Sequence, residues 1–172
     1  MKKILALIFS LMMLFSVSAM AEEESNVLNF NEAVMAELPG EFVLLEEFGM
    51  MFYLPSSMQQ IELTEADIAN GGYAGWTDGA AGGISIGCRP SADAEGNPIT
   101  DYETLCAFYN ESGLTSKMVT LNEIPCVTFS TEDASLFGVS YLLSDGSVLA
   151  FTFTGVVENT VVLSSIMLAL ME

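Results

Sequence analysis

Several oxygen-bearing side chains lie close together in the middle of the chain and could bind a calcium ion. They occupy a polar loop and the segment that follows it: Asp93, Glu95, Asn97, Asp101 and Glu103. Calcium prefers such oxygen ligands. However, Pro98 stands where an EF-hand loop needs glycine, and Thr104 stands where that loop needs its final bidentate glutamate. We therefore expect no metal, and keep a calcium site at Asp93, Glu95 and Asp101 as an alternative.

Side chains suited to covalent catalysis are scarce, because the chain has no histidine. This excludes histidine-based triads, histidine metal sites and histidine pH switches. Residues 83–87 match the Gly-x-Ser-x-Gly pattern around Ser85, but a nucleophile elbow joins a strand to a helix, and this serine lies within an alternating strand pattern. The 23 acidic residues could supply a carboxylate pair for hydrolysis. No spacing singles out one pair, so a carboxylate-dependent hydrolase is kept as an alternative.

The segment 71–83 is rich in glycine and contains Trp76, the single tryptophan of the chain. A phosphate-binding loop would need a lysine or a helix N-terminus after its glycines, whereas a strand pattern follows this segment. Hairpin turns and a close sheet surface are the favoured interpretation. Trp76 is expected in the core, and the alternative is an exposed Trp76 that anchors a binding partner.

Three cysteines, Cys88, Cys106 and Cys126, are separated by 18 and 20 residues, which fits no zinc pattern. Cys106 falls on the apolar face of a predicted helix, where a thiol behaves as a small buried hydrophobe. Cys88 and Cys126 fall in predicted strands, and an exported protein can oxidise such a pair. A Cys88–Cys126 disulfide is therefore an alternative to free thiols.

The first 21 residues have the three parts of a cleavable secretory signal. Lys2 and Lys3 give a positive start, an apolar run of 14 residues follows over 4–17, and the small-x-small triplet 19–21 precedes the expected cut before Glu22. The run is shorter than the ~20 apolar residues that span a bilayer. We expect residues 1–21 to be removed and the protein to be secreted or periplasmic.

The charge of the remaining chain is strongly negative. With Lys2 and Lys3 in the leader, Arg89 and Lys117 are the two basic residues left against 23 acidic ones, a formal net charge of −21. Nucleic acid and anionic membranes are excluded as partners, because both require clustered lysine and arginine. The charge favours a well-solvated surface, and the partner is expected to be an unknown protein or a small ligand, with no cofactor.

Apolar periodicity predicts one α+β domain over residues 22–172, an antiparallel sheet flanked by helices. Helices are expected over 29–38, from Thr100 to about Ser112, and from Asn159 to the C-terminus. Strands are expected over 42–47, 50–54, 73–77, 84–88, 118–121, 126–130, 137–143 and 149–153. Turn signals at Asp78-Gly79 and Asp145-Gly146 predict hairpins, which require antiparallel pairing.

The segment 119–129, Val-Thr-Leu-Asn-Glu-Ile-Pro-Cys-Val-Thr-Phe, resembles the strand, Asn-Gly-x-Pro turn and strand of small exported bacterial proteins of the Mog1/PsbP-like group. Glu123 stands where that group usually has glycine. The Asp145-Gly146 hairpin, the aromatic strand 151–153 and the terminal helix fit the same pattern. The resemblance covers most of the chain after the leader and implies an α/β/α sandwich. It also implies a non-catalytic binding or accessory role, and no functional residue of the group maps onto this chain.

The function expected from the sequence is therefore that of an exported acidic binding or accessory domain, acting through surface contacts without catalysis. The alternatives are the carboxylate-dependent hydrolase and a calcium-binding structural module.

Overall fold

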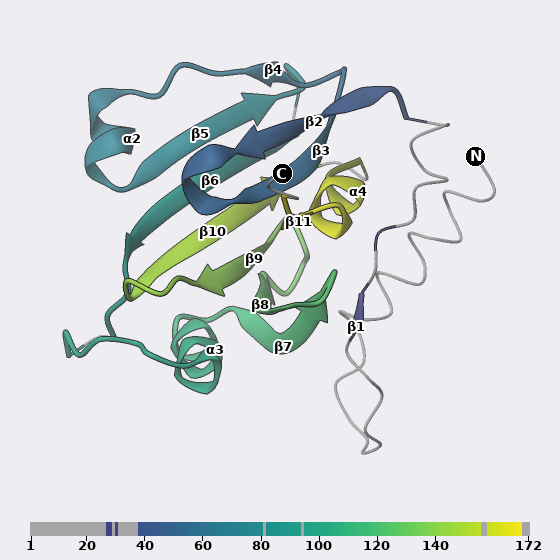
Figure 1. The fold of residues 1–172 in the computed structure, drawn as a ribbon. Helices are drawn as coiled ribbons and strands as arrows, with labels where there is room; N and C mark the ends of the chain where they lie inside the picture. Colours follow the sequence, from purple (N-terminus) through teal and green to yellow (C-terminus); the bar gives the residue numbers. More distant parts are fainter. Residues whose placement is uncertain are drawn as a thin grey trace.

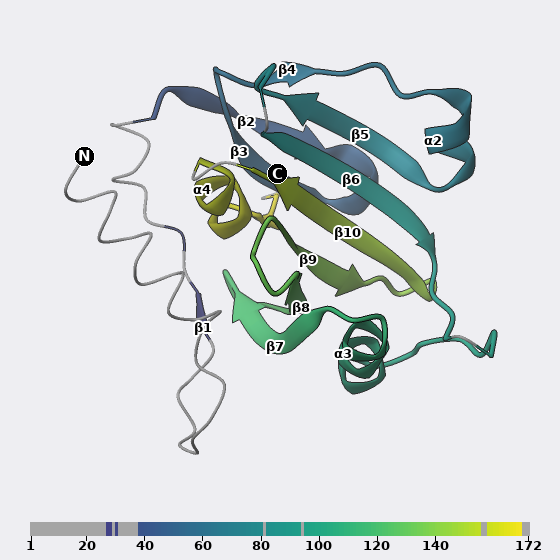
Figure 2. The ribbon, with the colours of Figure 1, turned by 180° about the vertical axis from the view of Figure 1, so that it is seen from behind.

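The computed structural model describes residues 27, 28, 30, 38–80, 82–93, 95–155 and 158–169. These residues form a large eight-stranded sheet and a small three-stranded sheet that crosses one face of it (Figures 1 and 2). The expected leader and nearly all of the expected helix 29–38 lie outside the described residues.

The bounds of the elements follow the expected ones closely in the middle of the chain. The strands are β1 (Val27–Leu28), β2 (Gly40–Leu45), β3 (Met50–Pro55), β4 (Gln59–Gln60), β5 (Gly72–Thr77), β6 (Gly83–Pro90), β7 (Thr115–Leu121), β8 (Ile124–Ser130), β9 (Leu136–Leu142), β10 (Ser147–Thr154) and β11 (Met167–Leu168). The helices are the 3-10 helix η2 (Glu46–Phe48), α2 (Glu65–Ala69), α3 (Tyr102–Glu111) and α4 (Glu158–Ser164).

The large sheet has the order β1-β7-β8-β9-β10-β6-β5-β4, and the small sheet has the order β11-β3-β2. Every neighbouring pair for which a register is defined is antiparallel except β1 with β7. Both hairpins form as expected: residues 78–82 join β5 to β6, and Asp145-Gly146 turns β9 into β10. Gly146 adopts φ 84°, which suits glycine, and Asp145 accepts a hydrogen bond from the Ser147 amide. The predicted α+β fold class is confirmed.

The two faces of the large sheet are covered differently. Alternate side chains of each strand, such as Ile84 and Ile86 of β6, point to the small sheet and α4 and form the main core around the fully buried Phe52. On the opposite face, α3 packs on β7 and β8 through a second cluster that includes Leu105, Tyr109 and Phe129. One face is thus covered by a sheet and a helix, where the sequence predicted helices alone.

The third helix begins one residue later than its sequence predicts. The expected helix begins at Thr100, but the N-cap is Asp101, whose carboxylate accepts hydrogen bonds from the Thr104 amide (2.7 Å) and hydroxyl (3.0 Å). An aspartate satisfies the free amides of a first turn and also complements the helix dipole.

The expected C-terminal helix was too long. Asn159 lies inside α4 and is buried, and the helix ends at Ser164 rather than continuing to the chain end. The hydroxyls of Ser164 and Ser165 donate to the Val161 and Val162 carbonyls, which competes with helix continuation. Ile166 stays fully buried, and the chain then extends into β11 beside β3.

The turn between β7 and β8 holds Asn122 at φ 46° and Glu123 at φ 69°. This left-handed conformation is tolerated by asparagine but strains a glutamate, because its β-carbon approaches the backbone. Replacing Glu123 with glycine should therefore stabilise the protein by about 1 kcal/mol. The increase is expected in the urea midpoint of unfolding, with an unchanged m-value.

Glu123→Ala is the matched control for this substitution, because it removes the same carboxylate but keeps the β-carbon. A stabilisation of the alanine variant equal to that of the glycine variant would assign the gain to charge and contradict the strain argument.

Candidate ligand-binding pocket

A concave pocket of about 720 Å³ lies on the face of the large sheet that carries α3, over β5, β6 and β10 and between α2 and α3. Its floor follows from strand alternation. Ile84 and Ile86 point into the core, so the intervening side chains of β6 point outward, and they are small. Register pairs them with equally small residues of β10, Ser85 with Thr152 and Gly87 with Ala150. Small side chains over two adjacent strands leave a hollow that the core face does not have.

The walls of the pocket come from segments on either side of this floor. Leu105, Phe108 and Tyr109 of α3 form one wall, and Ile61 and Leu63 before α2 form the other. The α3 wall is held in place from behind. Tyr109 stacks on Phe129 with ring centroids 4.6 Å apart, and its hydroxyl lies 2.6 Å from the buried Ser140 hydroxyl.

The third side comes from the loop that follows β6, through Ser91, Ala92, Asp93 and Ile99. The Ser91 hydroxyl donates to the carbonyls of Ile99 (2.8 Å) and Gly146 (3.1 Å), and Ala92 bridges Pro98. These bonds fasten the loop to the end of β6 and to the β9–β10 turn, so the loop is a fixed rim of the pocket.

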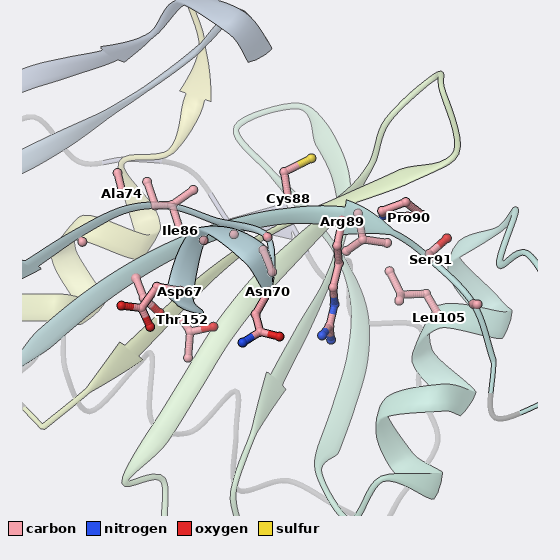
Figure 3. A pocket seen from close by; sticks show the side chains of 18 of the residues that line it. Asp67, Asn70, Ala74, Ile86, Cys88, Arg89, Pro90, Ser91, Leu105 and Thr152 are labelled. Atoms are coloured by element: carbon pink, nitrogen blue, oxygen red, sulfur yellow. The ribbon is translucent and has the colours of Figure 1, made fainter. Parts of the chain in front are cut away.

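Arg89 is the basic residue of the pocket. It continues the outward series of Ser85 and Gly87 at the end of β6, and in Figure 3 its side chain extends to the same side as Asn70, Asp67 and Thr152, whereas Cys88 points to the opposite side. Among the residues that the structure describes, the Arg89 guanidinium has no hydrogen-bond or ion-pair partner. Burial raises the pKa of Tyr109, and the Ser140 hydrogen bond and the positive charge of Arg89 offset part of that rise. The charge of Arg89 therefore acts on a group that lines the pocket.

The two carboxylates that line the pocket are already engaged by their own loops. Asp67 accepts hydrogen bonds from the Thr64 amide (2.9 Å) and hydroxyl (2.6 Å) in the capping box of α2. Asp93 accepts from the Asn97 amide (2.8 Å), from the Asn97 side chain (2.9 Å) and from the Glu95 amide (2.9 Å). These hydrogen bonds lower the pKa of both carboxyls, so both stay ionised in place.

The glycine-rich segment has the role of close packing that the sequence favoured. A β-carbon at Gly72 would lie 2.8 Å from the Asp67 carbonyl oxygen, and one at Gly71 would lie 2.7 Å from the Cys88 carbonyl oxygen. Gly71 also adopts φ 86°. These glycines let α2 lie directly on β5. Sequence reasoning counted Arg89 only as a charge and missed its place in the pocket. The sequence contained one indication of this place: Arg89 falls on the same side of the strand pattern as Ser85, which is the polar side.

Trp76 lies in the core, so the alternative of an exposed anchor is wrong. It is 6 % exposed and packs edge-to-face on Phe52 with ring centroids 5.4 Å apart. Strand alternation explains this position, because Trp76 pairs with Ile84, which also points inward.

The disulfide considered between Cys88 and Cys126 is also wrong, because both are free thiols. Cys88 lies on β6 and Cys126 on β8, with β10 and β9 between them. Three strand spacings separate them by about 14 Å, whereas bridged cysteines have α-carbons within about 7 Å. Burial raises the pKa of Cys126 to about 12, so this thiol stays protonated. Cys106, half-buried, lies 3.0 Å from the Ser116 hydroxyl.

The proposed calcium ligands are not gathered into one site. Asp93 and Glu95 belong to the loop, where Glu95 is a weak acceptor for Asn97 at 3.5 Å, while Asp101 caps α3. Across the described parts of the chain, no group of three or more His, Cys, Asp or Glu side chains could hold a metal ion. Ser85 of the Gly-x-Ser-x-Gly match is exposed in mid-strand on the pocket floor, away from any strand-to-helix turn.

Comparison with known proteins gives a likeness of fold. The solution structure of cyanobacterial PsbP from Synechocystis sp. PCC 6803 is similar, with a TM-score of 0.48 and 12% sequence identity over 88% of this chain and 98% of that chain. No protein-family model and no curated protein matches the chain. No helix in the described ranges is long and apolar enough to cross a membrane.

Proposed function

We propose that this chain is an exported binding domain that holds a small molecule, without catalysis, in the pocket between α2 and α3. The observation that carries the proposal is the hollow of about 720 Å³ over a floor of small side chains. Its volume lies in the range of small-molecule sites, about 300–1,000 Å³, and its mixture of apolar walls and few polar groups is typical of them. The secretory leader expected over residues 1–21 supports export.

Neighbouring groups do not fill the floor, and this favours a ligand over a purely structural role. Ser85 is exposed on an interior strand of the eight-stranded sheet, and Ala150 and Thr152 on the neighbouring strand are only half-buried. Elsewhere on this face, Val127, Phe129 and Val148 are buried under or beside α3. This part of the sheet face is therefore left open between apolar walls.

Filling the floor should weaken binding. With the purified protein, a set of small neutral, cationic and anionic aromatic compounds is expected to shift backbone amide NMR signals of pocket residues. The Ser85→Phe substitution places a ring in the hollow and should weaken each such ligand at least tenfold.

Thr115→Phe is the matched control, because Thr115 is an exposed strand residue of the same sheet outside the pocket. It should leave binding unchanged. If Ser85→Phe does not fold, as judged by the loss of dispersed amide signals, Thr152→Leu is a second variant that fills the pocket floor. The proposal would be overturned if no compound shifted pocket signals, or if the folded filled variants bound as the unmodified protein does.

A further inference from the structure

The charged side chains of the pocket differ in whether they already have a hydrogen-bond partner within the protein. This difference indicates which kind of ligand the pocket binds. Asp67 and Asp93 each accept hydrogen bonds from neighbours within their own loops. Arg89 has no such partner in the described part of the chain, although acids outnumber bases by 23 to two after the leader. An arginine unpaired in so acidic a protein keeps its guanidinium donors free for an external acceptor.

The geometry of that donor set favours a carboxylate. A guanidinium presents two parallel N–H groups that match the two oxygens of a carboxylate, and such bidentate pairs are short and charge-assisted. Phosphate esters would fit the same fork. They carry up to two negative charges, however, and would enter a protein of formal net charge −19 against repulsion from Asp67 and Asp93. A single negative charge is balanced by Arg89 alone.

The walls define the rest of the ligand. Leu105 and Phe108 on one side and Ile61 and Leu63 on the other offer apolar surface across the small floor. Ile61 is 43% exposed, and this is a large fraction for an isoleucine that lines a hollow. A flat apolar body between these walls would remove both its own surface and that of Ile61 from water.

Building on the proposed function, we infer that the pocket binds a small monocarboxylate with an apolar body, whose carboxylate pairs with Arg89 and whose body lies between α3 and the segment before α2. Arg89 selects for one negative charge, and the small residues of β6 and β10 provide the room.

Four compounds with one phenyl group separate charge from shape: 3-phenylpropionate, its neutral amide, 3-phenylpropylamine and phenyl phosphate. In amide NMR titrations of the purified protein, the carboxylate should bind at least tenfold more tightly than each of the other three. Arg89→Gln should lower the affinity for the carboxylate to that for the amide, and it should leave the affinity for the amide unchanged.

Lys117→Gln is the matched control, since it removes the same unit charge from β7, outside the pocket. It should keep the preference for the carboxylate. Equal pocket binding of carboxylate and amide, or preference for the amine or the phosphate, would overturn this inference while leaving the proposed function standing. If no compound bound in the pocket, both would fail.

Discussion

Replacing Gly138 with alanine is expected to destabilise the protein by about 3 kcal/mol, through overpacking. Gly138 lies on β9 opposite Thr152 of β10, and a β-carbon there would collide with the Phe151 carbonyl oxygen and with the Phe129 ring. Neither neighbour can move freely. Phe151 is fully buried within the sheet, and the Phe129 ring is fixed by its stack on Tyr109.

The substitution should also weaken ligand binding, because Phe129 supports Tyr109 and Tyr109 belongs to the α3 wall. A loss of stability should appear as a lower urea midpoint, and a displaced α3 should appear as shifted amide signals of Leu105 and Phe108. Added Phe129→Leu, which removes the colliding ring atoms, should recover part of the stability.

Gly75→Ala is the matched control for a glycine in the same sheet. Its β-carbon would meet mainly the tip of the Ile61 side chain, at 2.9 Å from Cδ1, and Ile61 is exposed enough to move. Gly75 is buried, but a flexible side-chain tip can give way where backbone cannot, so we expect a smaller loss than for Gly138→Ala, about 1 kcal/mol. If Gly138→Ala were no more destabilising than Gly75→Ala, the close packing of Phe129 on β9 would not be rigid.

Local patterns in the sequence predict local structure well. The turns at Asp78-Gly79 and Asp145-Gly146 form because glycine supplies the left-handed backbone that each turn needs. The cap at Thr64 and Asp67 forms because its partners are three residues apart. In each case the residues that determine the structure are neighbours in the chain.

The pocket could not be predicted in this way, because its floor depends on which strands pair. Nothing local indicates that β10 lies between β9 and β6, yet that order places Ala150 beside Gly87 and separates Cys88 from Cys126. The length of α4 has a similar explanation. Val162, Leu163 and Ile166 are all buried. Because Ile166 would fit this apolar stripe in either a helical or an extended conformation, apolar periodicity alone does not locate the helix end.

Replacing Asn122 with alanine is expected to destabilise the protein by about 3 kcal/mol, because one side chain connects three distant segments. Its amide nitrogen donates to the carbonyls of Ser164 and Ile166, each at 2.8 Å, and its oxygen accepts from the Phe30 amide at 2.7 Å. Together the three lost hydrogen bonds contribute about 2 kcal/mol. An alanine at φ 46° would add strain. Urea unfolding with an unchanged m-value measures the loss.

Asn122→Gly separates the hydrogen bonds from the backbone conformation, because glycine accepts the left-handed turn without strain. It should still lose about 2 kcal/mol, and the Tyr53 amide, which donates to the Ser165 hydroxyl at 2.7 Å, should exchange its hydrogen faster. Wild-type stability in Asn122→Gly would mean that the asparagine only shapes the turn. The expected loss would instead show that the β7–β8 turn holds the end of α4 against the core, because its side chain satisfies the carbonyls left free where that helix stops.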